Sequence, residues 1–146
     1  MPLAKARIIG LGSYLPEKVL SNHDLEKLVD TSDEWIVTRT GMRERRLAAE
    51  GEFTSTMAAE AGRLALTDSG LSIADIDMIL VATMTPDHLS PSTAAVVQPL
   101  LGAREIPAMD ISAACTGFIY GLAVAKALVE SGMHSNILLI GAEKMS

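Results

Sequence analysis

Cys115 is the residue of this sequence best suited to nucleophilic chemistry, and it is the only cysteine. It lies between an expected strand and an expected helix over residues 116–130. The amides and the dipole at a helix N-terminus favour a thiolate over a thiol. Its neighbours in the chain are small, which leaves room for an acyl group to approach the sulfur: Ala113, Ala114 and Gly117. A thiolate here could take an acyl group from a thioester and hold it covalently.

Cys115 is interpreted either as an activated nucleophile or as a structural residue of the core. Most free cysteines are small buried hydrophobic residues, and an activated cysteine also needs a base or an electrostatic partner. Of the three histidines, His23 lies beside an expected helix cap and His134 lies beyond the far end of the helix that follows Cys115. His88 follows an apolar strand, but no residue that would orient its ring is evident. The sequence therefore contains a candidate nucleophile without an identified base.

The segment from Asp30 to Arg46 is the second candidate site, because it contains the only tryptophan and the densest arginines. The indole of Trp35 can stack on a flat aromatic ring, and arginines such as Arg39 can bind phosphate with two parallel hydrogen bonds. Together they would suit a nucleotide-like group that carries phosphates. The alternative is a solvated face whose charges offset one another: Glu34, Arg39, Arg43 and Glu44.

The elements that would position these residues follow from the apolar runs. Four runs of strand length are expected as strands, at residues 7–11, 78–83, 106–111 and 137–140, and helices are expected at residues 25–29, 54–69, 93–101 and 116–130. Strands that are apolar on both faces, such as residues 78–83 and 137–140, belong inside a parallel sheet with helices on either side. The expected fold class is therefore α/β, with ligands bound beyond the C-terminal ends of the strands.

The glycines after the first expected strand, Gly10 and Gly12, are interpreted as turn residues. A dinucleotide-binding loop would need glycine or alanine at the sixth position of the motif, where this sequence has Leu15.

Composition excludes several classes of protein. The 146 residues are 49% hydrophobic and 21% charged, which excludes disorder, and the net charge of −6 argues against nucleic acid or an anionic membrane as a partner. A single cysteine allows neither an internal disulfide nor a cysteine-pair zinc site, so no metal is expected, and it favours a reducing compartment. The longest uncharged run, residues 111–125, is shorter than the roughly 20 residues that cross a bilayer. We expect a cytoplasmic protein.

Four segments together identify a resemblance. They are GLGSYLP over residues 10–16, DTSDEWIVTRTGMRERR over residues 30–46, VAT over residues 81–83 and DISAACTGF over residues 110–118. In these segments, from Ile8 onward, the chain resembles the N-terminal half of β-ketoacyl-acyl carrier protein synthase III, a condensing enzyme of the thiolase-like superfamily. The resemblance implies the first half of a layered α-β-α fold with a mostly parallel sheet, and it implies one domain-sized half over residues 1–146.

The resemblance also implies roles for particular residues. Cys115 matches the nucleophile that takes an acyl group from acyl-coenzyme A. Trp35 matches the residue that stacks on the adenine of coenzyme A, with Thr31 against the same ring system and Arg39 near the phosphates. Ser90 falls where some members of the family have a bulky aromatic residue, so we expect room for a primer longer than acetyl.

The family's reaction joins an acyl-coenzyme A primer to malonyl-acyl carrier protein with loss of carbon dioxide. In the family this initiates bacterial fatty acid synthesis, in a homodimer, with acyl-coenzyme A as a substrate and no cofactor. The family's decarboxylating histidine and asparagine come from a second half that this sequence does not contain, so the chain alone is expected to be inactive. Two other interpretations stay open, a non-catalytic fragment and a secondary-metabolite condensing enzyme. A half of this kind would expose an apolar surface where its sister half packs.

Overall fold

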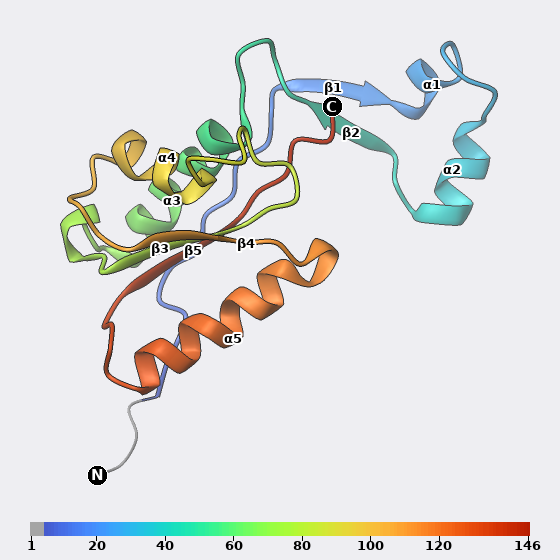
Figure 1. Ribbon diagram of the computed structural model, residues 1–146. Coiled ribbons are helices and arrows are strands. Elements are labelled where there is room, and N and C mark those ends of the chain that lie inside the picture. The colour runs from blue at the N-terminus through green and yellow to red at the C-terminus, as the bar shows by residue number, and fades with distance from the viewer. Residues whose placement is uncertain (1–4) are drawn as a thin grey trace. The chain divides into compact units, whose positions relative to one another are not determined.

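The computed structural model describes residues 5–146, which form two compact units (Figure 1). Unit 1 comprises residues 5–14 and 53–145, and unit 2 comprises residues 15–52 and Ser146. Unit 2 therefore contains the whole arginine-rich segment from Asp30 to Arg46. Among the described residues, no helix has the length and apolar character needed to cross a membrane.

Unit 1 is built on three parallel strands in the order β4-β3-β5. The central strand β3 (Met78–Ala82) is buried along its whole length, which confirms the prediction of an interior strand. β4 (Ala108–Ile111) pairs with one side of β3 and β5 (Ile137–Gly141) with the other, so that Leu80 lies opposite both Met109 and Leu139.

Helices cover both faces of this sheet (Figure 1). α3 (Thr54–Ser69) and α4 (Thr93–Leu101) lie on one face, and α5 (Gly117–Glu130) lies on the other. Small residues bring the helices close to the strands: a Cβ atom added to Gly121 of α5 would lie 2.6 Å from the Leu139 side chain. The expected α/β layered fold is confirmed, and the three long helices lie where the apolar spacing predicts them.

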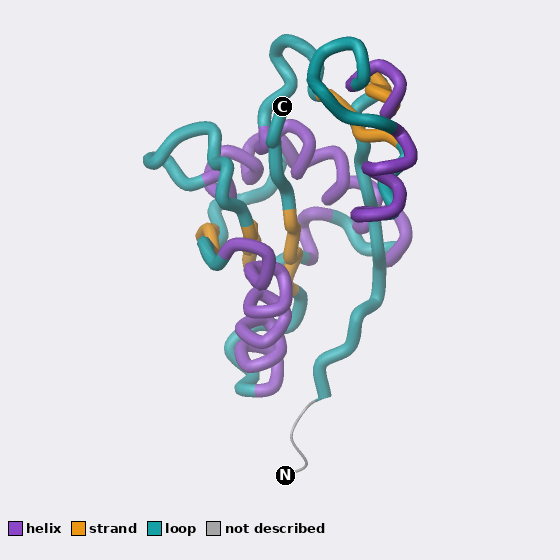
Figure 2. Tube along the Cα trace, turned by 90° about the vertical axis from the view of Figure 1, so that its right-hand side faces the viewer, coloured by secondary structure: helices purple, strands orange, loops and turns teal. Residues whose placement is uncertain are grey.

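The prediction of a strand over residues 7–11 is wrong. This segment belongs to no strand of the structure (Figure 2, teal). Its apolar side chains Ile8 and Leu11 are 66% and 71% exposed. Its glycines are not turn residues either. A Cβ atom on Gly10 or Gly12 would overlap the backbone of α3, so both glycines are needed because the extended chain lies directly against that helix.

Unit 2 contains two short antiparallel strands, β1 (Lys18–Ser21) and β2 (Glu44–Leu47), with α1 (Asn22–Leu25) and α2 (Asp33–Thr40) between them. The helix expected at residues 25–29 instead occupies residues 22–25. Ser21 begins it with a reciprocal cap, in which the Ser21 hydroxyl and Lys27 lower the pKa of Asp24 to about 2.

The buried Asn22 connects the parts of unit 2. Its amide nitrogen donates to the Asp33 carboxylate at 2.7 Å and to the Met42 carbonyl at 2.9 Å. Its amide oxygen accepts a hydrogen bond of 2.8 Å from Arg45. One side chain that is 1% exposed therefore joins α1, α2 and β2.

Candidate functional site

The C-terminal ends of the three strands of unit 1 lie at one edge of the sheet, because all three strands are parallel. Hydrogen bonds continue just beyond the strands, from the Thr83 amide to the Ile111 carbonyl at 3.2 Å and from the Ala142 amide to the Ala82 carbonyl at 3.1 Å. The loops that follow β3, β4 and β5 are therefore held side by side, as α/β sheets hold their ligand-binding loops. The loop after Leu11, also expected at this edge, follows no strand.

Cys115 lies at this edge, in a 3₁₀ turn over Ala114–Thr116 between β4 and α5. Its side chain is exposed rather than packed in the core, which removes the interpretation of a small buried hydrophobic residue. Gly117, at the first position of α5, is buried with Ala82 of β3 3.4 Å from where its Cβ would lie, so the turn lies directly on the sheet. The expected junction of strand, cysteine and helix is confirmed.

The turn that carries Cys115 has an unusual backbone. Ala114, immediately before the cysteine, has a φ of 48°, a left-handed conformation that costs alanine energy. The Thr116 hydroxyl donates to the Ala113 carbonyl at 2.8 Å and closes the turn. This conformation directs the chain abruptly from β4 into α5, and nothing in the sequence predicts it, since alanine is not a residue type that favours positive φ.

No histidine activates the thiol within residues 5–146, where Cys115 has no hydrogen-bond partner. His23 lies in unit 2 and contacts Glu26 at 3.2 Å. His134 lies after α5, its amide bonded to the Leu128 carbonyl, and His88 is exposed in the loop after β3. Among the described residues no histidine is bonded to the thiol, and the role of Cys115 as a nucleophile stays a prediction.

The loop between β3 and α4 contains Ser90, which is exposed, next to the fully exposed Leu89. Three contacts hold the base of this loop. The Thr54 hydroxyl donates to the Thr85 carbonyl at 2.6 Å, the Ser55 amide donates to the Asp87 carboxylate at 3.3 Å, and the Glu143 carboxylate accepts from the Met84 amide at 2.8 Å. The loop therefore leaves the sheet from a fixed base.

Two carboxylates at this edge are structural residues that the sequence does not single out. Asp110 accepts the amides of Thr93 and Ala94 at 2.7 and 2.8 Å, so a residue of β4 caps α4. Asp87 takes up an amide in the first turn of α3 in the same way. A single acidic residue at the end of an apolar strand is the available signal for Asp110, and it does not identify the partner.

The second candidate site is the exposed surface of α2 in unit 2. Ser32 caps the helix by accepting the Trp35 amide at 3.1 Å, and Gly41 ends it in a left-handed conformation. The Trp35 side chain is 58% exposed, and Arg39 follows it by one helical turn on the same side of the helix. Thr31 lies immediately before the cap, so the three predicted binding residues belong to one short helix and its start.

The charges of this surface do not cancel. Within the described chain, Arg39 and Arg43 make no ion pair with a carboxylate, whereas Arg46 contacts Glu44 at 3.5 Å and Arg45 binds Asn22. The interpretation of mutually offset charges therefore fails for the two arginines nearest the tryptophan. An exposed indole and two unpaired guanidinium groups can bind an aromatic ring that carries phosphates.

Comparisons with known proteins match this chain over nearly its whole length. A family model for 3-oxoacyl-[acyl-carrier-protein (ACP)] synthase III matches residues 109–146. The β-ketoacyl-[acyl-carrier-protein] synthase III of Chlamydia caviae is 58% identical over 144 residues, and that of Caldanaerobacter subterraneus is 60% identical over 141 residues. These matches cover 99% and 97% of this chain but 43% of each relative, so the chain spans less than half of their length.

Solved structures agree in fold. The 3-oxoacyl-[acyl-carrier-protein] synthase III from Aquifex aeolicus is 54% identical with a TM-score of 0.93, over 95% of this chain and 45% of that protein. The priming β-ketosynthase of the R1128 polyketide pathway is 38% identical with a TM-score of 0.94, over 98% of this chain and 43% of that protein.

Proposed function

Because this chain belongs to the β-ketoacyl-acyl carrier protein synthase III family, as a fragment from its N-terminal part, we propose that it supplies the acylation site of a condensing enzyme. In that enzyme an acyl-coenzyme A primer condenses with malonyl-acyl carrier protein in the first step of fatty acid synthesis. Residues 1–146 are proposed as the N-terminal half. The enzyme is proposed to be a cytoplasmic homodimer that needs no cofactor besides its substrates.

Cys115 is the proposed nucleophile. Its thiolate attacks the carbonyl carbon of the acyl thioester, a new carbon–sulfur bond forms, and the coenzyme A thiolate leaves and takes up a proton. The exposed position before α5 supports this role, since the helix N-terminus stabilises negative charge on the sulfur. In the second step the acyl group passes to the carbanion that malonyl-acyl carrier protein forms when it loses carbon dioxide.

Coenzyme A is the proposed ligand of the α2 surface. Trp35 would stack on the adenine, Thr31 would contact the same ring, and Arg39 would bind the phosphates. The observation that supports this assignment is the combination, on one exposed helix, of an indole and an arginine that no carboxylate neutralises.

Ser90 is proposed to affect the length of the primer. The loop that carries it is held at its base by Thr54, Ser55 and Glu143, and its tip, with Leu89 and Ser90, is exposed. Such a tip suits a contact with a second subunit, where a small residue would leave space in an acyl pocket. Replacing Ser90 by phenylalanine in the dimeric enzyme should shift its preference toward acetyl-coenzyme A. If the shift does not occur, Ser90 does not line the pocket.

The observation that carries the proposed function is the exposed Cys115 at the helix N-terminus, within a chain almost 60% identical to named synthases. The test is mass spectrometry after incubation with acetyl-coenzyme A. The protein is a chimera in which this chain replaces the matching part of the Chlamydia caviae relative. We expect one acetyl group on Cys115, none on a Cys115→Ala variant, and no condensation by that variant. Full condensation by Cys115→Ala would overturn the proposal.

A secondary-metabolite condensing enzyme remains the second candidate, because the R1128 priming β-ketosynthase has a closely similar fold. The two candidates differ in their primers and carrier proteins rather than in the acylation step. Turnover of the chimera with acetyl- and longer acyl-coenzyme A, measured with the carrier protein of fatty acid synthesis, separates them. Activity with that carrier protein supports the fatty acid synthase assignment, and a complete lack of activity favours the second candidate.

A further inference from the structure

Asn22 of α1 holds α2 at both of its ends. Its amide nitrogen donates to the carboxylate of Asp33, the first residue of that helix, at 2.7 Å, and to the carbonyl of Met42, just after the helix ends, at 2.9 Å. Trp35 and Arg39, the proposed ligands of coenzyme A, lie between these two contacts. One side chain of α1 therefore fixes the segment that carries both of them.

Asn22 also fixes the arginine-rich chain that follows α2. The backbone amide of Asn22 donates to the Arg43 carbonyl at 3.2 Å, and the Arg45 guanidinium donates to the Asn22 amide oxygen at 2.8 Å. Arg45 is thus engaged, whereas Arg39 and Arg43 make no ion pair with a carboxylate among the described residues. The two guanidinium groups that can bind phosphates are therefore those whose backbone Asn22 holds in place.

The contacts of Asn22 allow little variation in geometry. The residue is 1% exposed, and its side chain uses both N–H groups and its oxygen in hydrogen bonds. Glu26 strengthens the same connection, because its carboxylate accepts the Asp33 amide at 2.7 Å, a hydrogen bond that lowers the pKa of Glu26. Rotating or shifting α2 would leave several of these groups without partners, which is costly.

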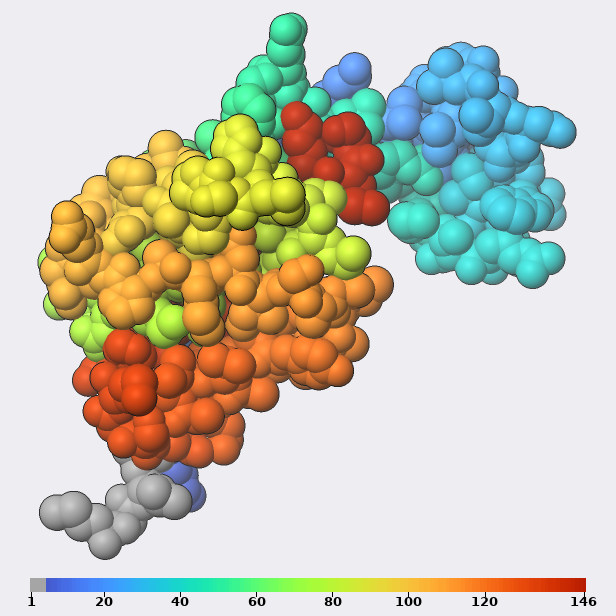
Figure 3. All heavy atoms as spheres, in the orientation of Figure 1, coloured from blue at the N-terminus to red at the C-terminus, as the bar shows by residue number. Residues whose placement is uncertain are grey.

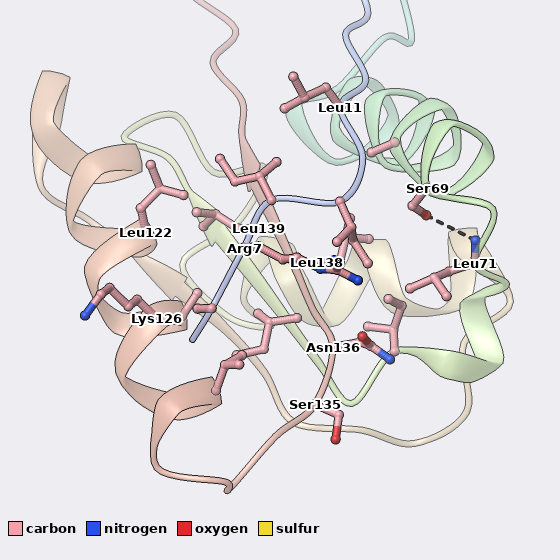
Figure 4. A pocket seen from close by; sticks show the side chains of 18 of the residues that line it. Arg7, Leu11, Ser69, Leu71, Leu122, Lys126, Ser135, Asn136, Leu138 and Leu139 are labelled. Carbon is pink, nitrogen blue, oxygen red and sulfur yellow. Dashed lines mark hydrogen bonds between the residues drawn. The ribbon is translucent and has the colours of Figure 1, made fainter. Parts of the chain in front are cut away.

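The open cavity of unit 1, of about 560 Å³, suits a nucleotide less well (Figure 4). Figure 4 shows Leu122, Leu138 and Leu139 around it, and its lining is mostly apolar. The ammonium group of Lys126, which also lines it, is already paired with the Glu130 carboxylate at 2.7 Å. Burying phosphates against apolar side chains is costly, so the α2 surface is the better site for the nucleotide.

We propose that Asn22 is a positioning residue for coenzyme A, which holds α2 and the arginines in the one arrangement where indole and guanidinium groups bind the nucleotide together. This role rests on the proposed function, since it concerns the same surface. Asn22 is buried and acts through the residues that it holds. The nucleotide is separated from the thioester by the pantetheine arm, so disturbing Asn22 should raise KM for acyl-coenzyme A and change kcat little.

Two substrates of the chimera test this role: acetyl-coenzyme A, and S-acetylpantetheine, which has the same thioester but lacks the nucleotide. The ratio of their kcat/KM values measures what the nucleotide contributes. Asn22→Asp removes both N–H donors and places a second carboxylate beside that of Asp33. Because the binding groups are then no longer held in place before the substrate binds, the ratio should fall at least about ten-fold. Activity with S-acetylpantetheine should be unchanged.

A double variant and a control separate positioning from stability. Asn22→Asp combined with Asp33→Asn exchanges donor and acceptor, so the new amide at position 33 can donate to the new carboxylate at position 22, and Arg45 keeps its acceptor. Most of the lost ratio should return. Ser21→Ala removes the hydroxyl that caps α1 and so weakens unit 2, but it leaves the contacts of Asn22 intact. Its ratio should equal that of the natural sequence.

An unchanged ratio in Asn22→Asp, together with a lower ratio in Trp35→Ala, would overturn the role of Asn22 and leave the proposed coenzyme A site intact. An equal loss in Ser21→Ala would also overturn it, because the stability of unit 2 would then be the cause. So would a double variant that recovers none of the lost ratio. If Trp35→Ala leaves the ratio unchanged, the proposed coenzyme A site fails, and the role of Asn22 fails with it.

Discussion

The Glu143 carboxylate accepts a hydrogen bond of 2.6 Å from the hydroxyl of Thr85, a residue 58 positions earlier in the chain. The same carboxylate accepts the Met84 amide, and the Lys144 amide donates to the Thr85 hydroxyl at 2.8 Å. The segment after β5 therefore fixes the start of the loop that contains Ser90.

We predict that Glu143→Ala releases this loop without unfolding the sheet. The substitution removes two hydrogen bonds to a charged acceptor, so the free energy of unfolding should fall by about 1 kcal/mol after allowance for solvent exposure. Limited proteolysis should cut faster between residues 84 and 92. Glu105→Ala removes an exposed carboxylate that has no hydrogen bond within the described residues, and it should leave both measurements unchanged. Equal cleavage of the two variants would contradict the prediction.

Gly12 should not tolerate a side chain, although it is exposed by surface area. An added methyl group would overlap the backbone of α3, which cannot move as a side chain would, so Gly12→Ala should cost about 2 kcal/mol. Urea unfolding followed by circular dichroism measures the loss. Ser13→Ala, a small change at the exposed neighbouring residue, should be nearly neutral. A Gly12→Ala variant as stable as Ser13→Ala would mean that the segment does not lie against α3.

Asp77 should make the stability of unit 1 dependent on pH. The amides of Asn136 and Ser135 donate to its carboxylate at 3.1 and 2.8 Å and lower its pKa below the ordinary value of 3.8. Because the pKa is lower in the folded state, this stabilisation is complete above the unfolded pKa and is lost as the pH falls through the folded value.

Asp77→Asn should therefore cost about 1 kcal/mol at pH 7 and progressively less below about pH 4. Thermal unfolding at several pH values measures this, with Asp30→Asn as the control, since Asp30 is exposed and has no partner within the described residues. If Asp77→Asn is destabilised relative to the natural sequence by the same amount at pH 3 and at pH 7, the charge of Asp77 is not the cause of the loss.

Asn22 should determine the stability of unit 2. Asn22→Ala leaves the groups of Asp33, Met42 and Arg45 without their shared partner and should cost about 2 kcal/mol. Trp35 is the only tryptophan, so its fluorescence during urea unfolding reports on unit 2. His23→Ala, at a side chain that is 73% exposed, should change the midpoint little. The prediction fails if both variants unfold at the same urea concentration.

Local patterns in the sequence predicted those elements of unit 1 whose own residue pattern indicates that they are buried. The run from Met78 to Thr83 is apolar on both faces and contains the central strand β3, and the helices α3 and α4 have the bounds that the apolar spacing predicts. The segment at residues 7–11 has the same apolar character, but a strand also needs a hydrogen-bonded neighbour, and no described residue provides one. An apolar pattern alone therefore does not predict which strand will be the partner.

The candidate sites could likewise be predicted only in part. Cys115, Trp35 and Arg39 were proposed from residue type and family resemblance, and the structure adds that Cys115 and Trp35 are exposed and that Arg39 is unpaired within residues 5–146. The positions of Glu143 and Asp110 could not be predicted, because their contacts join segments that are far apart in the chain. An exposed apolar surface was predicted from the resemblance, and Ile119 and Tyr120 of α5 are 61% and 55% exposed. Figure 3 shows α5 at the surface of unit 1, in orange.

The distribution of two rare residues has a practical consequence. The chain has one thiol and one indole, both exposed, and they belong to different units. A thiol-reactive acceptor dye on Cys115 would therefore form a donor–acceptor pair with Trp35 without any substitution. Energy transfer between them would report on the distance between the two units, in a protein whose natural sequence already contains both labelling positions.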